Sequence, residues 1–144
     1  MVPRWAKLAR DDSNSAKAPA VLVVDNEPGV RSFLQKALIL NGFQVWMAGD
    51  GKTAVEIYES HRDSIAVVLM DVCMPGVDGP ATLAALRSID PGVRCCFMTG
   101  GAGDYSREDL LAGGASHVLG KPFSLAEVVR VLHQMVSDSR SRVA

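Results

Sequence analysis

The sequence is short of cysteine, of net charge and of long apolar runs, and each shortage excludes a class of protein. Three cysteines cannot form a disulfide framework, and two of them, Cys95 and Cys96, are adjacent, so we expect a protein of a reducing compartment. No second pair of cysteines or histidines stands at the spacing of a zinc site. A formal net charge of −1 gives no support for a nucleic-acid-binding surface.

The sequence also shows no targeting or membrane signal. Its first residues, up to Lys7, lack the apolar core of a signal peptide. No apolar run approaches the roughly 20 residues that are needed to cross a bilayer. We therefore expect a cytoplasmic protein that binds no membrane.

The 144 residues suit one domain with a polar segment at each end. Residues 1–19 are expected to form a flexible tail, because they bury too little apolar surface to offset the entropy of ordering them. Residues 138–144 are expected to form a second polar tail. The folded domain is then expected over residues 20–137, and it contains no internal repeat.

Between the tails, short apolar runs alternate with segments of helical periodicity. The runs predict strands at 21–24, 44–48, 67–70, 95–98 and 117–120. The periodic segments predict helices that begin near Pro28, Asp50, Gly79, Ser106 and Ser124. Five such units predict an α/β fold of the (βα)5 type, a doubly wound parallel sheet with the flavodoxin-like strand order 2-1-3-4-5.

Four polar residues stand at or just beyond the ends of predicted strands: Asp25, Asp71, Thr99 and Lys121. In an open parallel sheet, ligands and chemistry gather outside the carboxyl ends of the strands. In this strand order the first and third strands flank the point where the chain reverses direction across the sheet, and Asp25 and Asp71 end those strands. We therefore expect two carboxylates, a hydroxyl and an ammonium to meet at one edge.

This group of side chains predicts the chemistry of a metal ion and a phosphoryl group. Two nearby carboxylates repel each other unless a cation neutralises them, and Mg²⁺ binds one or two carboxylates while keeping waters for a phosphate. An aspartate can act as a nucleophile and carry a phosphoryl group. The transfer needs mainly positioning and charge neutralisation, which Lys121, Thr99 and Mg²⁺ would supply.

The chain resembles the receiver domain of bacterial response regulators in four segments that occur in the expected order. The segments are Val-Val-Asp-Asn-Glu-Pro at 23–28, Leu-Met-Asp-Val-Cys-Met-Pro-Gly-Val-Asp-Gly at 69–79, Met-Thr-Gly at 98–100, and Gly-Ala-Ser with Gly-Lys-Pro-Phe within 114–123. The resemblance covers about residues 19–137.

The resemblance implies a role for each matching residue. Asp71 would accept a phosphoryl group from a histidine kinase or a histidine phosphotransfer protein, and Thr99 and Lys121 would contact that group. Asp25, Asp71 and the main-chain carbonyl of Cys73 would bind Mg²⁺, and Asn26 would contribute through water. The bond between Lys121 and Pro122 would be the cis peptide of the family.

Two positions depart from the family pattern. Asn26 stands where family members commonly have a second acid, so one negative charge is missing and we expect weaker Mg²⁺ binding. Val118 stands three residues before the lysine, where family members often have an aromatic residue that rotates inward on phosphorylation. The usual coupling between the threonine and that aromatic ring is therefore not expected here, because Val118 has no ring.

The sequence thus predicts a stand-alone phosphorylation-dependent signalling switch of a two-component phosphorelay. It would catalyse only its own phosphorylation and dephosphorylation, and act as a monomer or a weak phosphorylation-dependent homodimer. The surface of the fourth helix, fifth strand and fifth helix would signal to a downstream effector protein.

Three alternatives remain at this point. The first is a degenerate receiver that no longer accepts phosphate and serves as a binding scaffold. The second is a Mg²⁺-dependent phosphatase or phosphotransferase, which would need a second acid where Cys73 stands. The third is a fragment of a hybrid kinase or of a larger regulator.

Overall fold

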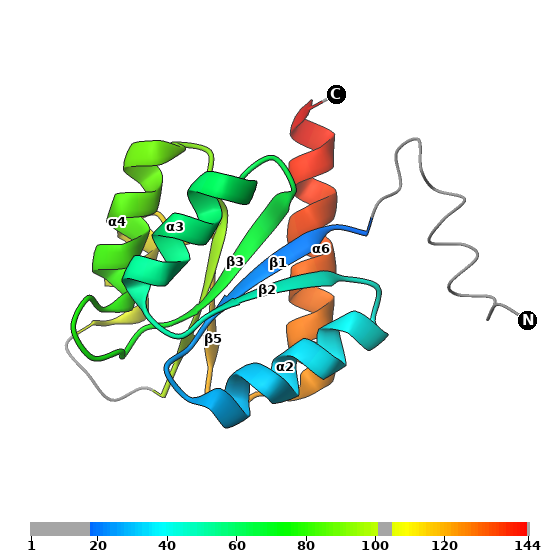
Figure 1. Ribbon diagram of the computed structural model, residues 1–144, viewed down its shortest axis with the longest axis horizontal. Coiled ribbons are helices and arrows are strands. Elements are labelled where there is room, and N and C mark those ends of the chain that lie inside the picture. The colour runs from blue at the N-terminus through cyan, green and yellow to red at the C-terminus, as the bar shows by residue number, and fades with distance from the viewer. Residues whose placement is uncertain (1–17, 101–104, 144) are drawn as a thin grey trace, which may run out of the picture.

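The computed structural model describes residues 18–100 and 105–143, which form a five-stranded parallel sheet between two layers of helices (Figure 1). The strand order is β2-β1-β3-β4-β5, as the sequence predicted. The strands are β1 (Ala20–Val24), β2 (Gln44–Ala48), β3 (Ile65–Asp71), β4 (Cys95–Thr99) and β5 (His117–Gly120). The helices are α2 (Pro28–Leu40), α3 (Gly51–His61), α4 (Gly79–Ile89), α5 (Arg107–Ala112) and α6 (Leu125–Val143).

The sheet has an apolar core on each face, because successive strand residues point to opposite sides. On one side, Leu22 and its equivalents in other strands lie in the same core as buried residues of α3, α4 and α5. On the other, Val21 and its equivalents pack with buried residues of α2 and α6. Strand β1 is therefore buried along its whole length, which explains why it reads as a continuous apolar run.

Side-chain caps fix where several helices begin. A carboxylate oxygen of Asp50 accepts from the Thr53 amide at 2.7 Å at the start of α3. The hydroxyl of Ser124 accepts from the Glu127 amide at 3.1 Å at the start of α6. Each bond satisfies an amide that has no partner within its own helix. The helix starts expected at Asp50 and Ser124 are confirmed.

The sequence predicted a polar tail at each end of the chain, and the structure describes mainly the C-terminal one. Helix α6 runs to Val143, so the stretch 138–143, which was expected to form a polar tail, is helical. The stretch contains no proline or glycine that would end the helix. Of the N-terminal tail expected at 1–19, residues 1–17 lie outside the described residues. Across the described ranges, none of the helices has the length and apolar character required to cross a membrane.

Candidate functional site

The strand register brings the predicted site residues to one edge of the sheet. Strand β1 pairs with β3 so that Val24 lies opposite Met70, and the carboxylates of Asp25 and Asp71 follow directly. Strand β4 pairs with β5 so that Thr99 lies opposite Gly120, directly before Lys121. Parallel strands end on the same side of a sheet, which is why residues far apart in the sequence converge here.

The ammonium group of Lys121 lies between the two carboxylates. Its Nζ is 3.6 Å from Oδ2 of Asp71 and 3.9 Å from Oδ2 of Asp25. The backbone amide of Lys121 donates to the carbonyl of Thr99 at 2.7 Å, which holds the lysine beside the end of β4. The peptide bond between Lys121 and Pro122 is cis, as the resemblance implied. The Lys121 ammonium thus lies beside the carboxylates of Asp25 and Asp71, and Thr99 ends the neighbouring strand.

Asp25 is fully buried, and its two oxygens have different surroundings. Oδ1 accepts from the amide of Glu27 at 2.9 Å. Oδ2 is buried and has no hydrogen-bond donor within the described part of the chain, although Lys121 is near it. A buried carboxylate oxygen without a donor carries a desolvation cost, which a bound cation would offset.

Asp71 is also buried, with 6% of its surface exposed. Burial raises the pKa of its carboxyl group above the ordinary value, the ammonium of Lys121 lowers that pKa, and the nearby charge of Asp25 raises it. Its Oδ1 also accepts from the amide of Cys73 at 3.3 Å, which favours the ionised form. A desolvated carboxylate next to one cation is a good nucleophile once it is ionised.

The residues around these carboxylates suit a magnesium ion. A depression of about 500 Å³ beside the site is lined by Asn26, Cys73, Asp78 and Tyr105, among others. Among the described residues there is no cluster of three or more His, Cys, Asp or Glu side chains that could enclose a metal. Mg²⁺ does not need such a cluster, because it keeps several waters and accepts amide and carbonyl oxygens. Two carboxylates, the amide of Asn26 and the carbonyl of Cys73 therefore fit it.

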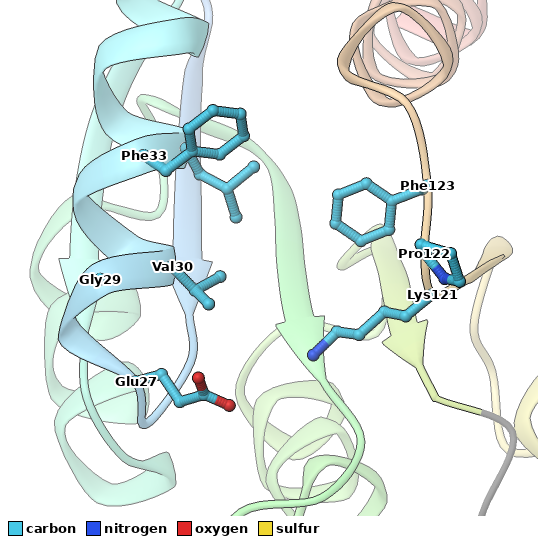
Figure 2. Close-up of a pocket in the computed structure, with 8 residues that line it drawn as sticks. Glu27, Gly29, Val30, Phe33, Lys121, Pro122 and Phe123 are labelled. Carbon is cyan, nitrogen blue, oxygen red and sulfur yellow. The ribbon is translucent and has the colours of Figure 1, made fainter.

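An apolar cleft of about 450 Å³ opens directly beside Lys121 (Figure 2). Phe33 of α2 and Phe123 face each other across it, and the Lys121 side chain extends below them toward Glu27. Phe33 is 57% exposed. It is not among the residues of α2 that pack into the apolar core on this face of the sheet. An exposed aromatic ring at the edge of an apolar cleft is typical of a surface that binds another protein.

Sequence reasoning missed two residues that support this edge of the sheet. Arg31 of α2 donates to the backbone carbonyl of Asp25 at 2.7 Å, which fixes the peptide that leads into Asn26. The Tyr105 hydroxyl donates to Oδ2 of Asp78 at 2.8 Å. Asp78, followed by Gly and Pro, carries the signal of a helix cap, and it caps α4. Nothing in the spacing of Arg31 or Tyr105 indicates where their side chains reach.

The end of β5 differs from the family pattern as the sequence indicated. Val118 is buried in the core between the sheet and α3, α4 and α5. Its backbone carbonyl accepts a hydrogen bond from the guanidinium of Arg107 in α5 at 3.0 Å. The aliphatic side chain of Val118 therefore occupies the inward-facing position of β5, and Arg107 ties α5 to that strand.

Comparison with known proteins assigns the chain to a family. Residues 21–133 match the response regulator receiver domain. The chain is 36% identical over 128 residues to the sensor kinase CckA of Brucella abortus, with 89% of this chain and 13% of that protein covered. It is 37% identical over 112 residues to the transcriptional regulatory protein PrrA of Mycobacterium bovis, with 78% of this chain and 47% of that protein covered. The chain thus spans less than half the length of these relatives.

Solved structures agree with this assignment. CheY in the CheX–CheY–BeF3–Mg²⁺ complex of Borrelia burgdorferi superposes with a TM-score of 0.74 at 28% identity, over 81% of this chain and 87% of that one. Vibrio cholerae CheY4 superposes with a TM-score of 0.75 at 25% identity, over 81% of this chain and 98% of that one. The strand order, the residues at the strand ends and these similarities lead to one conclusion: the chain belongs to the response regulator receiver domain family of two-component signal transduction.

Proposed function

We propose that this chain is a phosphorylation-dependent switch in which Asp71 accepts a phosphoryl group from a phosphohistidine donor. The observation that carries the proposal is the position of the Lys121 ammonium, 3.6 Å from Asp71 and 3.9 Å from Asp25. This arrangement neutralises part of the negative charge that accumulates when an anionic carboxylate attacks an anionic phosphoryl group.

In the transfer step, an oxygen of Asp71 forms a bond to phosphorus while the bond from phosphorus to the donor imidazole nitrogen breaks. The imidazole leaves with the electron pair of that bond and takes a proton from solvent. Lys121 faces the oxygens of the transferred group, and the hydroxyl of Thr99 at the end of β4 would donate to one of them. These residues supply positioning and charge, which is what phosphoryl transfer mainly requires.

Asp25, Asp71, the Cys73 carbonyl and Asn26 would hold Mg²⁺ at this site. The ion would supply positive charge to the phosphoryl oxygens. The buried Oδ2 of Asp25, which accepts no hydrogen bond from the described residues, supports this assignment. The Borrelia CheY relative, whose complex contains Mg²⁺ and BeF3, supports it as well.

The phosphohistidine donor would dock at the cleft between Phe33 and Phe123. The cleft is apolar, exposed and adjacent to Lys121, so a protein seated there could present a side chain to the acceptor (Figure 2). A histidine kinase or a histidine phosphotransfer protein would carry the donor histidine.

The phosphorylated form would signal to an effector protein through α5, β5 and α6. Helix α5 has six residues, and Leu110 is the buried one among them, so the helix is weakly anchored. Weakly anchored elements are the ones that shift when a switch changes state. Phosphorylation would add about −1.5 to −2 of charge at Asp71, if an acyl phosphate behaves like other protein phosphates.

The test of phosphorylation is intact mass after incubation with Mg²⁺ and phosphoramidate, beside the Asp71→Asn variant. We expect the mass of one phosphoryl group to be gained by the wild type, and not by the variant or without Mg²⁺. If the acyl phosphate hydrolyses too fast for a mass gain to be detected, the binding of beryllofluoride is measured instead, through amide chemical shifts. If neither response occurs, the chain is a scaffold that does not accept phosphate. Sustained release of phosphate from external phosphomonoesters would indicate an enzyme instead.

The test of the docking cleft compares two kinds of donor. We expect Phe33→Ala to slow transfer from an autophosphorylated histidine kinase that phosphorylates the wild type, by about tenfold or more. Transfer from phosphoramidate, which needs no docking surface, should keep its rate. Leu40→Ala, at the far end of α2 and 85% exposed in the wild type, is the matched control. Equal transfer by the kinase to both variants would place docking elsewhere.

A further inference from the structure

The hydrogen bond between Tyr105 and Asp78 joins the starts of two helices. The hydroxyl of Tyr105, just before the cap of α5, donates to Oδ2 of Asp78 at 2.8 Å. Oδ1 of the same carboxylate accepts from the amide of Ala81 at 2.9 Å and caps α4. One side chain therefore holds the first turn of α4 and the segment that enters α5.

The start of α4 rests on the backbone of the phosphate acceptor. The amide of Gly79 donates to the carbonyl of Val72 at 2.9 Å. A Cβ at Gly79 would lie 2.6 Å from the carbonyl oxygen of Asp71, so no side chain separates the helix from the acceptor. A shift in the backbone at Asp71 therefore reaches the first residue of α4, which directly follows Asp78.

Tyr105 lines two hollows of the surface. It lines the depression of about 500 Å³ that also contains Asn26 and Cys73. It also lines a second cavity, of about 350 Å³, together with Leu83 of α4 and Leu110, the buried residue of α5. Tyr105 thus borders both the proposed metal site and the cavity in which the buried residue of α5 lies.

We propose that Tyr105 is the positioning residue that couples occupancy of Asp71 to helix α5, acting through its hydrogen bond to Asp78. The inference rests on the proposed phosphorylation of Asp71. It assigns the coupling role to a residue at the start of α5, whereas β5 presents the aliphatic Val118 to this side of the sheet. The ring is 41% exposed, so its position can change without opening the core.

The chain provides its own matched control. Its only other tyrosine, Tyr58, donates to Oδ2 of Asp90 at 2.7 Å. Asp90 is the residue at the opposite end of α4. Tyr58→Phe and Tyr105→Phe therefore remove the same kind of hydrogen bond from the two ends of one helix. A purely structural role would change stability in either variant without changing the response to a ligand at Asp71.

The first measurement uses the chain labelled with 3-fluorotyrosine, which gives one fluorine resonance for each tyrosine. Mg²⁺ and beryllofluoride are added as the phosphoryl analogue. We expect the resonance of Tyr105 to shift and that of Tyr58 to stay in place. Equal shifts, or a shift of Tyr58 alone, would contradict the proposal.

The second measurement follows backbone amides during the same titration. In the wild type and in Tyr58→Phe, we expect shifts both at Cys73 and along α5, at Leu110 and Leu111. In Tyr105→Phe we expect the shift at Cys73 to remain and those along α5 to fall to less than half. Full α5 shifts in Tyr105→Phe would overturn this inference alone. No shift at Cys73 in the wild type would overturn the proposed phosphorylation and this inference together.

Discussion

Asn26 is the residue whose chemistry most directly sets the affinity of the proposed metal site. It lines the depression beside the acceptor and carries no charge, whereas a carboxylate there would attract a cation. A unit charge about 4 Å from another contributes on the order of 1–4 kcal/mol in surroundings between bulk water and a protein surface. We therefore expect Asn26→Asp to tighten Mg²⁺ binding about tenfold or more, as measured by isothermal titration calorimetry.

The control for this variant is Asn41→Asp, which changes the net charge equally. Asn41 lies just beyond the opposite end of α2, so its substitution should leave the Mg²⁺ affinity close to that of the wild type. Equal affinities of Asn26→Asp and the wild type would show that Asn26 lies outside the coordination sphere of the ion and its waters.

Asp71 makes the stability of the metal-free protein depend on pH. Because burial raises its pKa in the folded state, the folded state binds more protons than the unfolded state at pH values between the ordinary value of 3.8 and the raised one. Stability from this residue is therefore lost as pH rises through that window. We expect Asp71→Asn to be more stable than the wild type at pH 7.5 without Mg²⁺, and the difference to shrink at pH 4, in urea denaturation.

Asp50 provides a control with the opposite trend. Hydrogen bonds from Thr53 lower the pKa of this exposed helix cap, so its ionised form stabilises the fold above that pKa. Asp50→Asn should lose stability relative to the wild type at pH 7.5, and the loss should disappear as the pH falls. A stabilising effect of Asp71→Asn that is the same at both pH values would show that the carboxyl charge is not its cause.

At the scale of residues, the sequence predicted which side chains lie at the ends of strands, because the course of the backbone alone determines their positions. Asp25, Asp71, Thr99 and Lys121 each stand at a strand end, and strand ends are visible as the limits of apolar runs. The contacts of Tyr105 depend on where a long side chain reaches after the helices have packed. No local pattern encodes such a reach.

Among the structural elements, helix α4 is the one whose position is tied most closely to the acceptor. A Cβ at Gly79 would lie 2.6 Å from the Asp71 carbonyl oxygen and 2.9 Å from the Phe97 ring and from the Cα of Val72. Backbone atoms cannot move aside as the end of a flexible side chain can. We expect Gly79→Ala to lower the free energy of unfolding by about 2 kcal/mol or more, measured by urea denaturation, and to slow phosphorylation.

Gly29 gives the matched comparison for that substitution. It lies in the first turn of α2, and a Cβ there would meet nothing within 4 Å. Gly29→Ala should raise the free energy of unfolding by about 0.5–1 kcal/mol, because alanine favours helix. If both alanine variants were equally stable, the α4 start would have room to move away from Asp71.

The limits of the elements were predictable where a cap or a breaker marks them. Asp50 and Ser124 begin helices as expected, and α4 begins at Gly79 as expected. Helix α6 runs to Val143, beyond the boundary expected at residue 137, because the polar residues after Val136 permit a helix but do not require one. Composition alone cannot separate a polar helix from a polar tail.

For the whole molecule, a ligand that binds only the folded state adds stability that grows with the logarithm of the ratio of its free concentration to its dissociation constant. Mg²⁺ at one hundred times its dissociation constant would add about 2.7 kcal/mol, which for a domain of this size raises the melting temperature by roughly 10 °C. We expect this shift in a calorimetric scan of the wild type.

The control for the Mg²⁺ shift is the Asp25→Asn variant. It retains the shape of the buried side chain but loses its charge, so the shift should fall to less than half. A shift of the same size in this variant would mean that Mg²⁺ binds elsewhere on the chain.

The order of the strands in the sheet was the feature most easily predicted from the sequence. Alternation of strands and helices, together with right-handed crossovers, leaves few arrangements of five parallel strands, and the observed order is one of them. What the pattern could not supply is the shape of the surface, such as the exposed position of Phe33 beside Phe123 (Figure 2). That shape depends on how α2 and the segment before α6 lie on the same face of the sheet.

The cysteines give the molecule a chemical handle. Cys95 and Cys96 are buried on opposite faces of the sheet, and burial raises the pKa of Cys96 to about 12 and that of Cys95 well above its ordinary value. Cys73 is the exposed thiol, two residues after the acceptor. A maleimide or a fluorinated alkylating reagent should therefore label one position without mutagenesis. The rate of that labelling would follow the filling of the acceptor site, in a single tube and in real time.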